Sequence, residues 1–467
     1  MVHLSLRPQP LGIFPPPTGY LVLPPVDGAE EMCASLLAGR LPKQMPASLR
    51  FYALALANDQ QGAWRALAND PTPEAHYNRF VLRSDPEAYP HLRRQLNGDL
   101  AALLDLVAYM GGLIDSPPAV ETLRGEIAAC ILPAHAACAL ARQQYDAAIA
   151  ALQRAIEEVR RISPLFAAQL LDHLATVYLN ANQSSAALQA LRDAATLAVG
   201  GRLFDLRAYL SLRLGMLCQD QANGQRALLL EANEWFQEAL RCCSVERTPD
   251  LYALAHYRLA LTLLAIAPSG NGDQATRERA IQSLRESLRV YTCETHYDQW
   301  LNAQITLANA LRISSAASPN EHLIEAVRLY DEVLAHRDQD HDPIGYGRVL
   351  ANQGTALFHL GRFDCARDRL IRARSIFLSH RDYGAAALLE EALVEIDCRV
   401  SRTENQELRT RNQSGVREPS HVQRATTFQP LTPRAPHLAP LASCLLRRSP
   451  LTPLASLACV VAHFSDY

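Results

Sequence analysis

The sequence predicts an all-α protein, a solenoid in which antiparallel helix pairs stack one on another. The first observation is a signature that recurs six times: an alanine, a bulky residue four positions later and a smaller residue three positions beyond it. The copies begin at Ala148, Ala187, Ala232, Ala280, Ala326 and Ala366. The second observation is helical periodicity from about 117 to 376, interrupted by short polar turns. Self-similarity of this kind indicates stacked repeats, because each unit buries its apolar face only against its neighbours.

A partner helix precedes each signature. It is marked by a small residue at positions 136, 175, 215, 260, 308 and 354, which follow one another at intervals of 39 to 48 residues. The small residue precedes the signature alanine by 12 residues in three units and by 17 to 20 in the others. The additional residues fall in polar stretches, where turns tolerate insertions. Small residues let two helices approach closely, and the large residues fill the gaps between pairs.

Composition divides the rest of the chain. Residues 1–27 are rich in proline, which fixes φ and removes a backbone donor, so we expect an extended arm. Residues 28–116 form short helices between prolines, an irregular helical region. The solenoid spans 117–400 and includes a last helix over about 382–399, which caps its exposed end. Residues 401–467 are polar and then rich in Pro, Ser, Thr and Leu, which predicts a disordered tail.

Charge and composition limit the partners and the compartment. The chain is 49% hydrophobic and 20% charged, as in soluble proteins, and its net charge of −3 gives no reason to expect nucleic acid or an anionic membrane. No apolar run reaches the roughly 18 residues of a membrane span, and the first residues lack a signal-peptide pattern. The eleven cysteines are scattered without a CxxC pair, which favours reduced thiols in the cytoplasm.

No pattern in the sequence predicts catalysis or a cofactor. There is no Gly-rich phosphate loop of either common form and no HExxH pair, and Lys43 is the only lysine. His336 and His341, with the aspartates between and after them, could ligate a divalent ion. A solvated loop between two repeats explains this run more simply. We therefore expect no metal and no cofactor, and a protein that is not an enzyme.

The repeat resembles the tetratricopeptide repeat family, in which each unit is a helix–turn–helix of about 34 residues. In the best unit, GTALFHLGRFDCARDRLIRARSIF, the family's motif is matched by Gly354, Leu357, Gly361, Phe363, Ala366, Leu370 and Ala373. The match covers about 135–376, and units with longer spacing are similar to long-period bacterial versions. The resemblance implies a right-handed solenoid whose first helices line a concave surface.

Partner peptides lie along that concave surface in the family, so the resemblance also implies a binding groove. The family's inward-facing positions correspond to Tyr257, Leu261, Asn302, Ile305, Asn309, Arg312, Arg348, Thr355, Phe358 and His359. Asparagine can hold a peptide backbone, and arginine can pair with a carboxylate. Asn309 stands where the chaperone-binding members place an asparagine of their lysine–asparagine–arginine clamp. Because the groove has no lysine, we do not expect that particular activity.

The predicted function is that of a non-enzymatic scaffold or adaptor, which binds a peptide or helix of a protein partner in the groove. Two alternatives remain open. One is a regulatory protein that senses a ligand or peptide through a change in superhelix curvature, and a closed pocket would favour it. The other is an enzyme with a site in residues 28–130. A buried polar cluster around Trp64, His76, Tyr77 and His91 would favour that second alternative.

Overall fold

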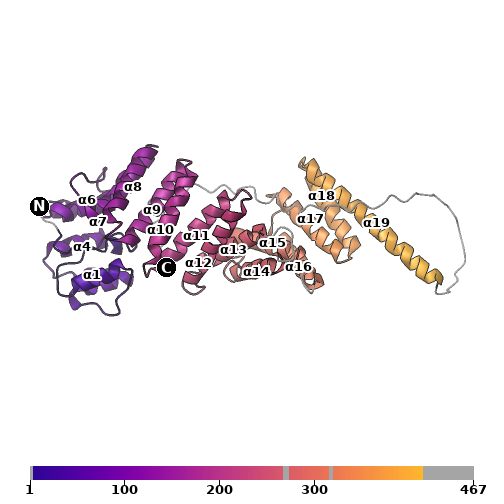
Figure 1. Cartoon of the computed structure of the whole chain (residues 1–467), viewed down its shortest axis with the longest axis horizontal. Helices are drawn as coiled ribbons and strands as arrows, with labels where there is room; N and C mark the ends of the chain where they lie inside the picture. Colours follow the sequence, from indigo (N-terminus) through magenta and orange to yellow (C-terminus); the bar gives the residue numbers. More distant parts are fainter. Residues whose placement is uncertain (1–3, 267–272, 315–318, 414–467) are drawn as a thin grey trace. The chain divides into compact units, whose positions relative to one another are not determined.

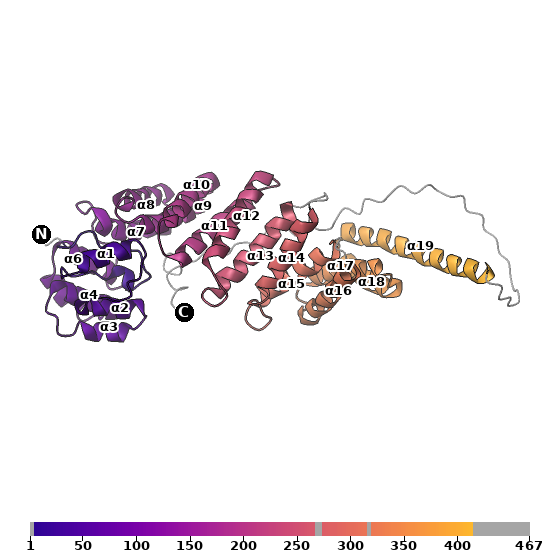
Figure 2. The ribbon, with the colours of Figure 1, turned by 60° about the horizontal axis from the view of Figure 1, so that its bottom comes forward.

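The computed structural model describes residues 4–266, 273–314 and 319–413, and every regular element within these ranges is a helix (Figure 1). The chain divides into two compact units, one extending to Tyr297 and one beginning at Asp298. Within each unit the successive long helices run antiparallel and pack side by side, as a second view shows (Figure 2). The prediction of an all-α fold with tetratricopeptide-like helix pairs is confirmed. No helix in the described ranges is long and apolar enough to cross a lipid bilayer.

The helix pairs coincide with the six repeats marked by the sequence signature. In the first unit the pairs are α7 (Gly125–Ala141) with α8 (Tyr145–Val159), α9 (Pro164–Asn180) with α10 (Ser184–Val199), α11 (Phe204–Gln221) with α12 (Arg226–Cys242), and α13 (Pro249–Ile266) with α14 (Asp273–Ser287). The second unit contains α15 (Tyr297–Arg312), whose first residue precedes the boundary, with α16 (Pro319–His336), and α17 (Pro343–His359) with α18 (Phe363–Ser379). A last helix, α19 (Tyr383–Gln413), packs on α18.

Burial explains why the signature recurs. Every alanine, bulky residue and smaller residue of the six copies is at most 1% exposed. A Cβ built on Gly215 would lie 2.7 Å from the ring of Phe236, and one built on Gly354 would lie 2.8 Å from Leu370. In these two repeats the small position of the first helix therefore receives the bulky residue of its own second helix. This contact fixes how closely the two helices of a pair approach.

The turns inside the short units share one backbone conformation. Gln143, Asn182 and Gly361 all have positive φ, between 57° and 75°, at the end of a first helix. In each case the following amide closes the helix end by donating to a carbonyl five residues back, as in Arg362 to Leu357 at 2.9 Å. Asparagine tolerates this conformation better than most residues, which explains Asn182 where the family usually has glycine.

Short helices precede the repeats. They are α1 (Ala29–Leu37), α2 (Arg50–Leu56), α3 (Gln60–Ala66), α4 (Pro73–Arg83), α5 (Tyr89–Gln95) and α6 (Gly98–Met110), with 3-10 turns η1 (Thr18–Tyr20) and η2 (Ala47–Leu49). Prolines set several of these boundaries. Pro73 occupies the first turn of α4, where a missing amide costs nothing, and the hydroxyl of Thr72 caps the same helix by accepting from Ala75 N at 3.3 Å.

Both ends of the described chain differ from a simple arm and tail. Residues 4–27 contain no α-helix, but their apolar side chains, including Leu11, Ile13 and Leu21, are buried in the first unit. At the other end, α19 covers the core of α18 with Ala386, Leu389 and Ile396. The helix continues past the expected end near 399 and is described as far as Gln413. Most of the expected disordered tail, residues 414–467, lies outside the described residues.

Candidate partner-binding face

Two helices of the second unit each carry predicted groove residues along one side. On α15 the predicted residues follow one another at intervals of three or four, and on α17 Arg348, Thr355 and His359 do so once Asn352 is included, which places each set on a single helix face; the predicted Phe358 lies beside that face. We call this surface the α15–α17 face; it consists of Asn302, Ile305, Asn309, Arg312, Arg348, Asn352, Thr355 and His359. The side-chain amide of Asn352 donates to Oδ1 of Asn309 at 3.0 Å and thereby joins the two helices. Asn352 is not among the residues that the sequence predicted.

Asn309 forms hydrogen bonds within the second unit. Its Oδ1 accepts a second hydrogen bond, of 2.6 Å, from the hydroxyl of Tyr330 on α16. Tyr330 is the bulky signature residue of its pair and is completely buried. A buried hydroxyl needs a partner, and Asn309 supplies it. The carbonyl oxygen of Asn309 is therefore used inside the second unit rather than offered to a bound peptide backbone.

Arg312, in the last turn of α15, is one of two arginines of the face. Its side chain is half-buried, and it lies within hydrogen-bonding reach of the Tyr330 hydroxyl. Burial raises the pKa of Tyr330 to about 12, against an opposing effect of the Arg312 charge. Among the described residues no carboxylate forms an ion pair with Arg312, and its buried Nε has no hydrogen-bond partner.

His359, on α17, lies between two arginines of the neighbouring helices in its electrostatic surroundings. Partial burial, followed by the charges of Arg312 and Arg399, lowers the pKa of His359. The guanidinium of Arg399, on α19, lies 5.9 Å from the ring centre of Phe358, while its Nε donates to Glu395 at 2.9 Å. The ring of Phe358 also meets that of His359 edge-on at 5.5 Å. His359 is thus close to Arg312 on α15 and to Arg399 on α19, and the ring of Phe358 contacts both His359 and Arg399.

The other predicted residues differ in what they can offer a partner. Asn302 and Arg348 are exposed, and Ile305 is half-buried. The hydroxyl of Thr355 donates to the carbonyl of Ala351, on its own helix, at 2.9 Å. Tyr257 and Leu261 lie half-buried on α13, which belongs to the first unit. The structure therefore brings together the predicted residues of α15 and α17 and leaves those of α13 in the other unit.

First helices of the first unit carry charges that are already paired. Nη1 of Arg213 on α11 lies 3.0 Å from Oδ1 of Asp172 on α9, and Tyr209 donates to the same carboxylate at 3.3 Å. Asp172 is only 4% exposed. Between α11 and α13, Gln219 donates to the hydroxyl of Thr262 at 3.0 Å and accepts from Arg258 at 3.3 Å. These polar groups hold neighbouring first helices together.

The loop suspected of binding metal uses its carboxylates for local structure. Oδ1 of Asp342 caps α17 by accepting from Gly345 N at 2.9 Å, and its other oxygen pairs with Arg337. Oδ1 of Asp338 accepts from the amide of Asp340 at 2.8 Å. Over the described ranges, no group of three or more His, Cys, Asp or Glu side chains is arranged to hold a metal ion.

The residues of the enzyme alternative have separate partners. The guanidinium of Arg83 lies 4.1 Å from the ring centre of Trp64. The hydroxyl of Tyr77 donates to the carbonyl of Tyr20 at 2.9 Å, and the imidazole of His91 meets the amide of Gln95, also at 2.9 Å. The contacts of these residues therefore do not link them into one polar cluster.

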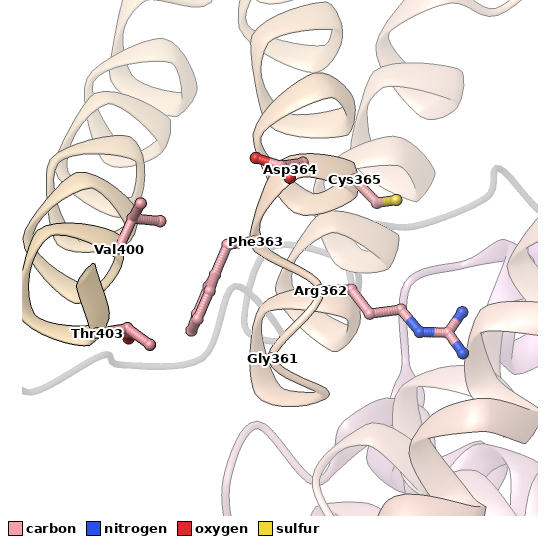
Figure 3. Close-up of a pocket in the computed structure, with 7 residues that line it drawn as sticks. All are labelled: Gly361, Arg362, Phe363, Asp364, Cys365, Val400 and Thr403. Atoms are coloured by element: carbon pink, nitrogen blue, oxygen red, sulfur yellow. The ribbon is translucent and has the colours of Figure 1, made fainter. Parts of the chain in front are cut away.

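A hollow of about 400 Å³ lies beside the turn between α17 and α18 (Figure 3). It is lined by Gly361, Arg362, Phe363, Asp364, Cys365, Val400 and Thr403. In Figure 3 the ring of Phe363 points toward α19, whereas Arg362 and Cys365 point away from it. The hollow is open rather than closed, so it does not have the form of the pocket that a small-molecule sensor would need.

Comparison with known proteins gives a likeness of architecture. No family model and no curated protein matches the chain. Apo RapI is 12% identical, with a TM-score of 0.41, and the match covers 76% of this chain and 98% of RapI. Aspartyl phosphate phosphatase F from Bacillus subtilis is also 12% identical, with a TM-score of 0.33 over 76% of this chain and 96% of the other.

A third solved structure is the TPR2AB-domain:pHSP90-complex of yeast Sti1. It is 15% identical, with a TM-score of 0.24, and the match covers 58% of this chain and 98% of the other. One of these structures is named for a complex and another for a phosphatase. At these identities and TM-scores the likeness does not distinguish binding from catalysis, so the function has to be argued from the side chains of this chain.

Proposed function

We propose that the protein is a non-enzymatic interaction module, which binds an acidic segment of a protein partner on the α15–α17 face. The observation that carries the proposal is the position of Arg312. It lies half-buried near His359, and no carboxylate of the described chain pairs with it. A carboxylate supplied by a partner would give Arg312 the counter-charge that it lacks.

The surroundings of Arg312 suit a peptide rather than an isolated ion. Exposed Asn302 and Arg348 extend the polar surface along α15 and α17. Ile305 and Phe358 supply apolar surface beside it. An extended or helical segment with one acidic side chain next to an apolar one would contact both kinds of group. We place this binding in the cytoplasm, in accord with the free thiols of the described cysteines.

The first unit is a poorer candidate for the same role. Its inward-facing Arg213 and Arg258 already contact Asp172 and Gln219 on the preceding first helices. A partner would have to replace those contacts before it gained any of its own, and buried ion pairs are costly to break. On the α15–α17 face a partner could pair with Arg312 without first breaking an ion pair.

The test is capture of a partner by the immobilised full chain. We compare the wild type with an Arg312→Ala/Arg348→Ala variant and with an Arg328→Ala/Arg372→Ala variant. The second variant removes two exposed arginines from α16 and α18, so it matches the change in net charge. We expect a protein that is retained by the wild type and the control, is lost with the first variant, and is eluted by a Glu-rich but not a Lys-rich peptide. Equal retention by all three chains would refute the proposal.

A further inference from the structure

Residues 4–24, which we call the N-terminal segment, are held in the first unit in an unusual way. The segment has no α-helix or strand, so its backbone groups must find partners outside regular structure. Side chains of the helices provide several of them. Asp99 on α6 accepts from Leu4 N at 3.1 Å, Cys33 on α1 donates to Pro8 O at 2.8 Å, and Gln169 on α9 donates to Ile13 O at 2.9 Å.

Asn78, on α4, makes the most complete of these contacts. Its Oδ1 accepts from Val22 N at 2.9 Å, and its Nδ2 donates to Val22 O at 2.8 Å. One side-chain amide thus takes the place of a neighbouring β-strand for that residue. Asn78 is only 1% exposed, so without the segment both of its polar atoms would lose their partners. Such a side chain recognises an extended backbone whatever its sequence.

A specific side chain of the segment is recognised as well. Arg7 pairs with Asp99, and its Nη1 lies 2.7 Å from Oε1 of Glu126 at the start of α7. Both carboxylates are buried, at 4% and 2% exposed. Two buried carboxylates this close favour a cation between them, and Arg7 supplies the ion pair that the buried Glu126 needs. The helices are therefore arranged for a basic residue at this point of the segment.

The shape of the segment is also matched to the helices. Gly12 has φ of +70°, and a Cβ built on it would lie 2.2 Å from the ring of Phe166 on α9. A side chain at this position would meet both backbone strain and a ring with which it would overlap. Apolar residues on either side, such as Leu11 and Ile13, are buried. The segment therefore covers part of α9, a first helix of the repeats.

We propose that α1, α4, α6, α7 and α9 form a binding site for an extended apolar peptide with one arginine, and that the N-terminal segment occupies this site in cis. The site recognises three features of the bound peptide: its backbone amides and carbonyls, the guanidinium of one arginine, and a glycine at the position of Gly12. It is separate from the α15–α17 face and does not depend on the function proposed for that face. Once the link to α1 is cut, the site binds the same segment as a free peptide.

The test uses the full chain with a protease recognition sequence inserted between Asp27 and Gly28, both of which are exposed. After cleavage, a fluorescent synthetic peptide of residues 4–24 is added and its anisotropy is followed. The peptide is compared with Arg7→Ala, Gly12→Ala and Ser5→Ala versions. Ser5 is exposed, so its replacement is the matched control. The uncut chain shows whether the occupied site excludes the peptide.

We expect the cut chain to keep its helical circular dichroism and to bind the free peptide, whereas the uncut chain binds none. The Arg7→Ala and Gly12→Ala peptides should bind at least about tenfold more weakly, and the Ser5→Ala peptide should bind like the parent. If the four peptides bind equally, or if the cut chain binds none even in mild denaturant, the proposal is overturned. Loss of helical signal on cleavage would also overturn it, since the segment would then be an inseparable part of the core.

Discussion

The hydroxyl of Tyr330 donates a 2.6 Å hydrogen bond to Oδ1 of Asn309. The sequence places Tyr330 among the residues that build the repeat and Asn309 among those that face a partner. This bond joins one residue of each set. Most units carry leucine at the bulky signature position, and leucine has no polar tip. In this unit the tyrosine requires an acceptor on the first helix, so one residue of the α15–α17 face is used to satisfy the core.

Removal of that hydroxyl should lower stability without disturbing packing. We expect Tyr330→Phe to reduce the free energy of unfolding by about 1 kcal/mol, because one buried hydrogen bond is lost while the ring remains. Asn309 keeps its bond from Asn352. Urea denaturation checks the difference. Tyr383→Phe is the control, since Tyr383 is 65% exposed, and equal effects of the two changes would contradict the structural role of Asn309.

The small position at Gly354 should tolerate no added carbon. A Cβ at Gly354 would lie 2.8 Å from Leu370, whereas one at Gly384 would have its nearest neighbour 3.9 Å away. We expect Gly354→Ala to destabilise by about 1 to 3 kcal/mol through overpacking. Gly384→Ala should be neutral or stabilise by up to about 1 kcal/mol, because alanine favours a helix. Thermal unfolding of both variants measures the change in stability. A Gly354→Ala variant more stable than the wild type would refute the close approach of Gly354 to Leu370.

The ion pair between first helices of the first unit should matter more than a surface pair. We expect Arg213→Met to cost about 3 kcal/mol, since it leaves the buried carboxylate of Asp172 uncompensated. Arg247→Met should cost less than about 1 kcal/mol, because Arg247 and its partner Asp205 are both exposed. Denaturation of both variants gives the comparison. Similar losses of unfolding free energy in the two variants would mean that the Arg213–Asp172 pair contributes no more to stability than a surface pair.

Acid should weaken the first unit through His173. Burial lowers the pKa of His173, with Arg213 acting in the same direction and Asp172 against it. The folded state therefore disfavours the proton that the unfolded chain binds near pH 6.5. Stability should be fully present above about pH 6.5 and should fall as the pH drops toward the lowered pKa. His173→Gln should reduce the difference in urea midpoint between pH 7.5 and pH 5.5, and an unchanged difference would exclude His173 as its source.

The repeat could be predicted because its contacts are made by residues at fixed spacing within one helix pair. Gly354 meets Leu370 within one antiparallel pair, and the turn between its two helices is short. The polar partners of the α15–α17 face could not be predicted in the same way. Whether Asn309 faces a peptide or the hydroxyl of Tyr330 depends on side-chain directions across three helices. Arg399 was missed because it lies on the helix beyond the recognised repeats.

The buried state of residues 4–24 illustrates a second limit. Proline content indicates a backbone that is not helical, and it says nothing about burial. A signal was present in the apolar residues between the prolines, such as Leu11, Ile13 and Leu21, which a solvated arm would not need. The helix residues that bond the backbone of this segment, including Asn78 and Gln169, are far away in sequence. Only the folded chain shows that they meet.

The most direct measurement of the central claim is site-specific photo-cross-linking of the full chain. A photoreactive residue is placed at Asn302, exposed on α15, or at Arg372, exposed on α18 away from the face. We predict a cross-linked partner from position 302 and none from 372, with the cross-linked peptide of the partner containing acidic residues. Cross-linking at 372 alone, or equally at both positions, would contradict the assignment of the α15–α17 face.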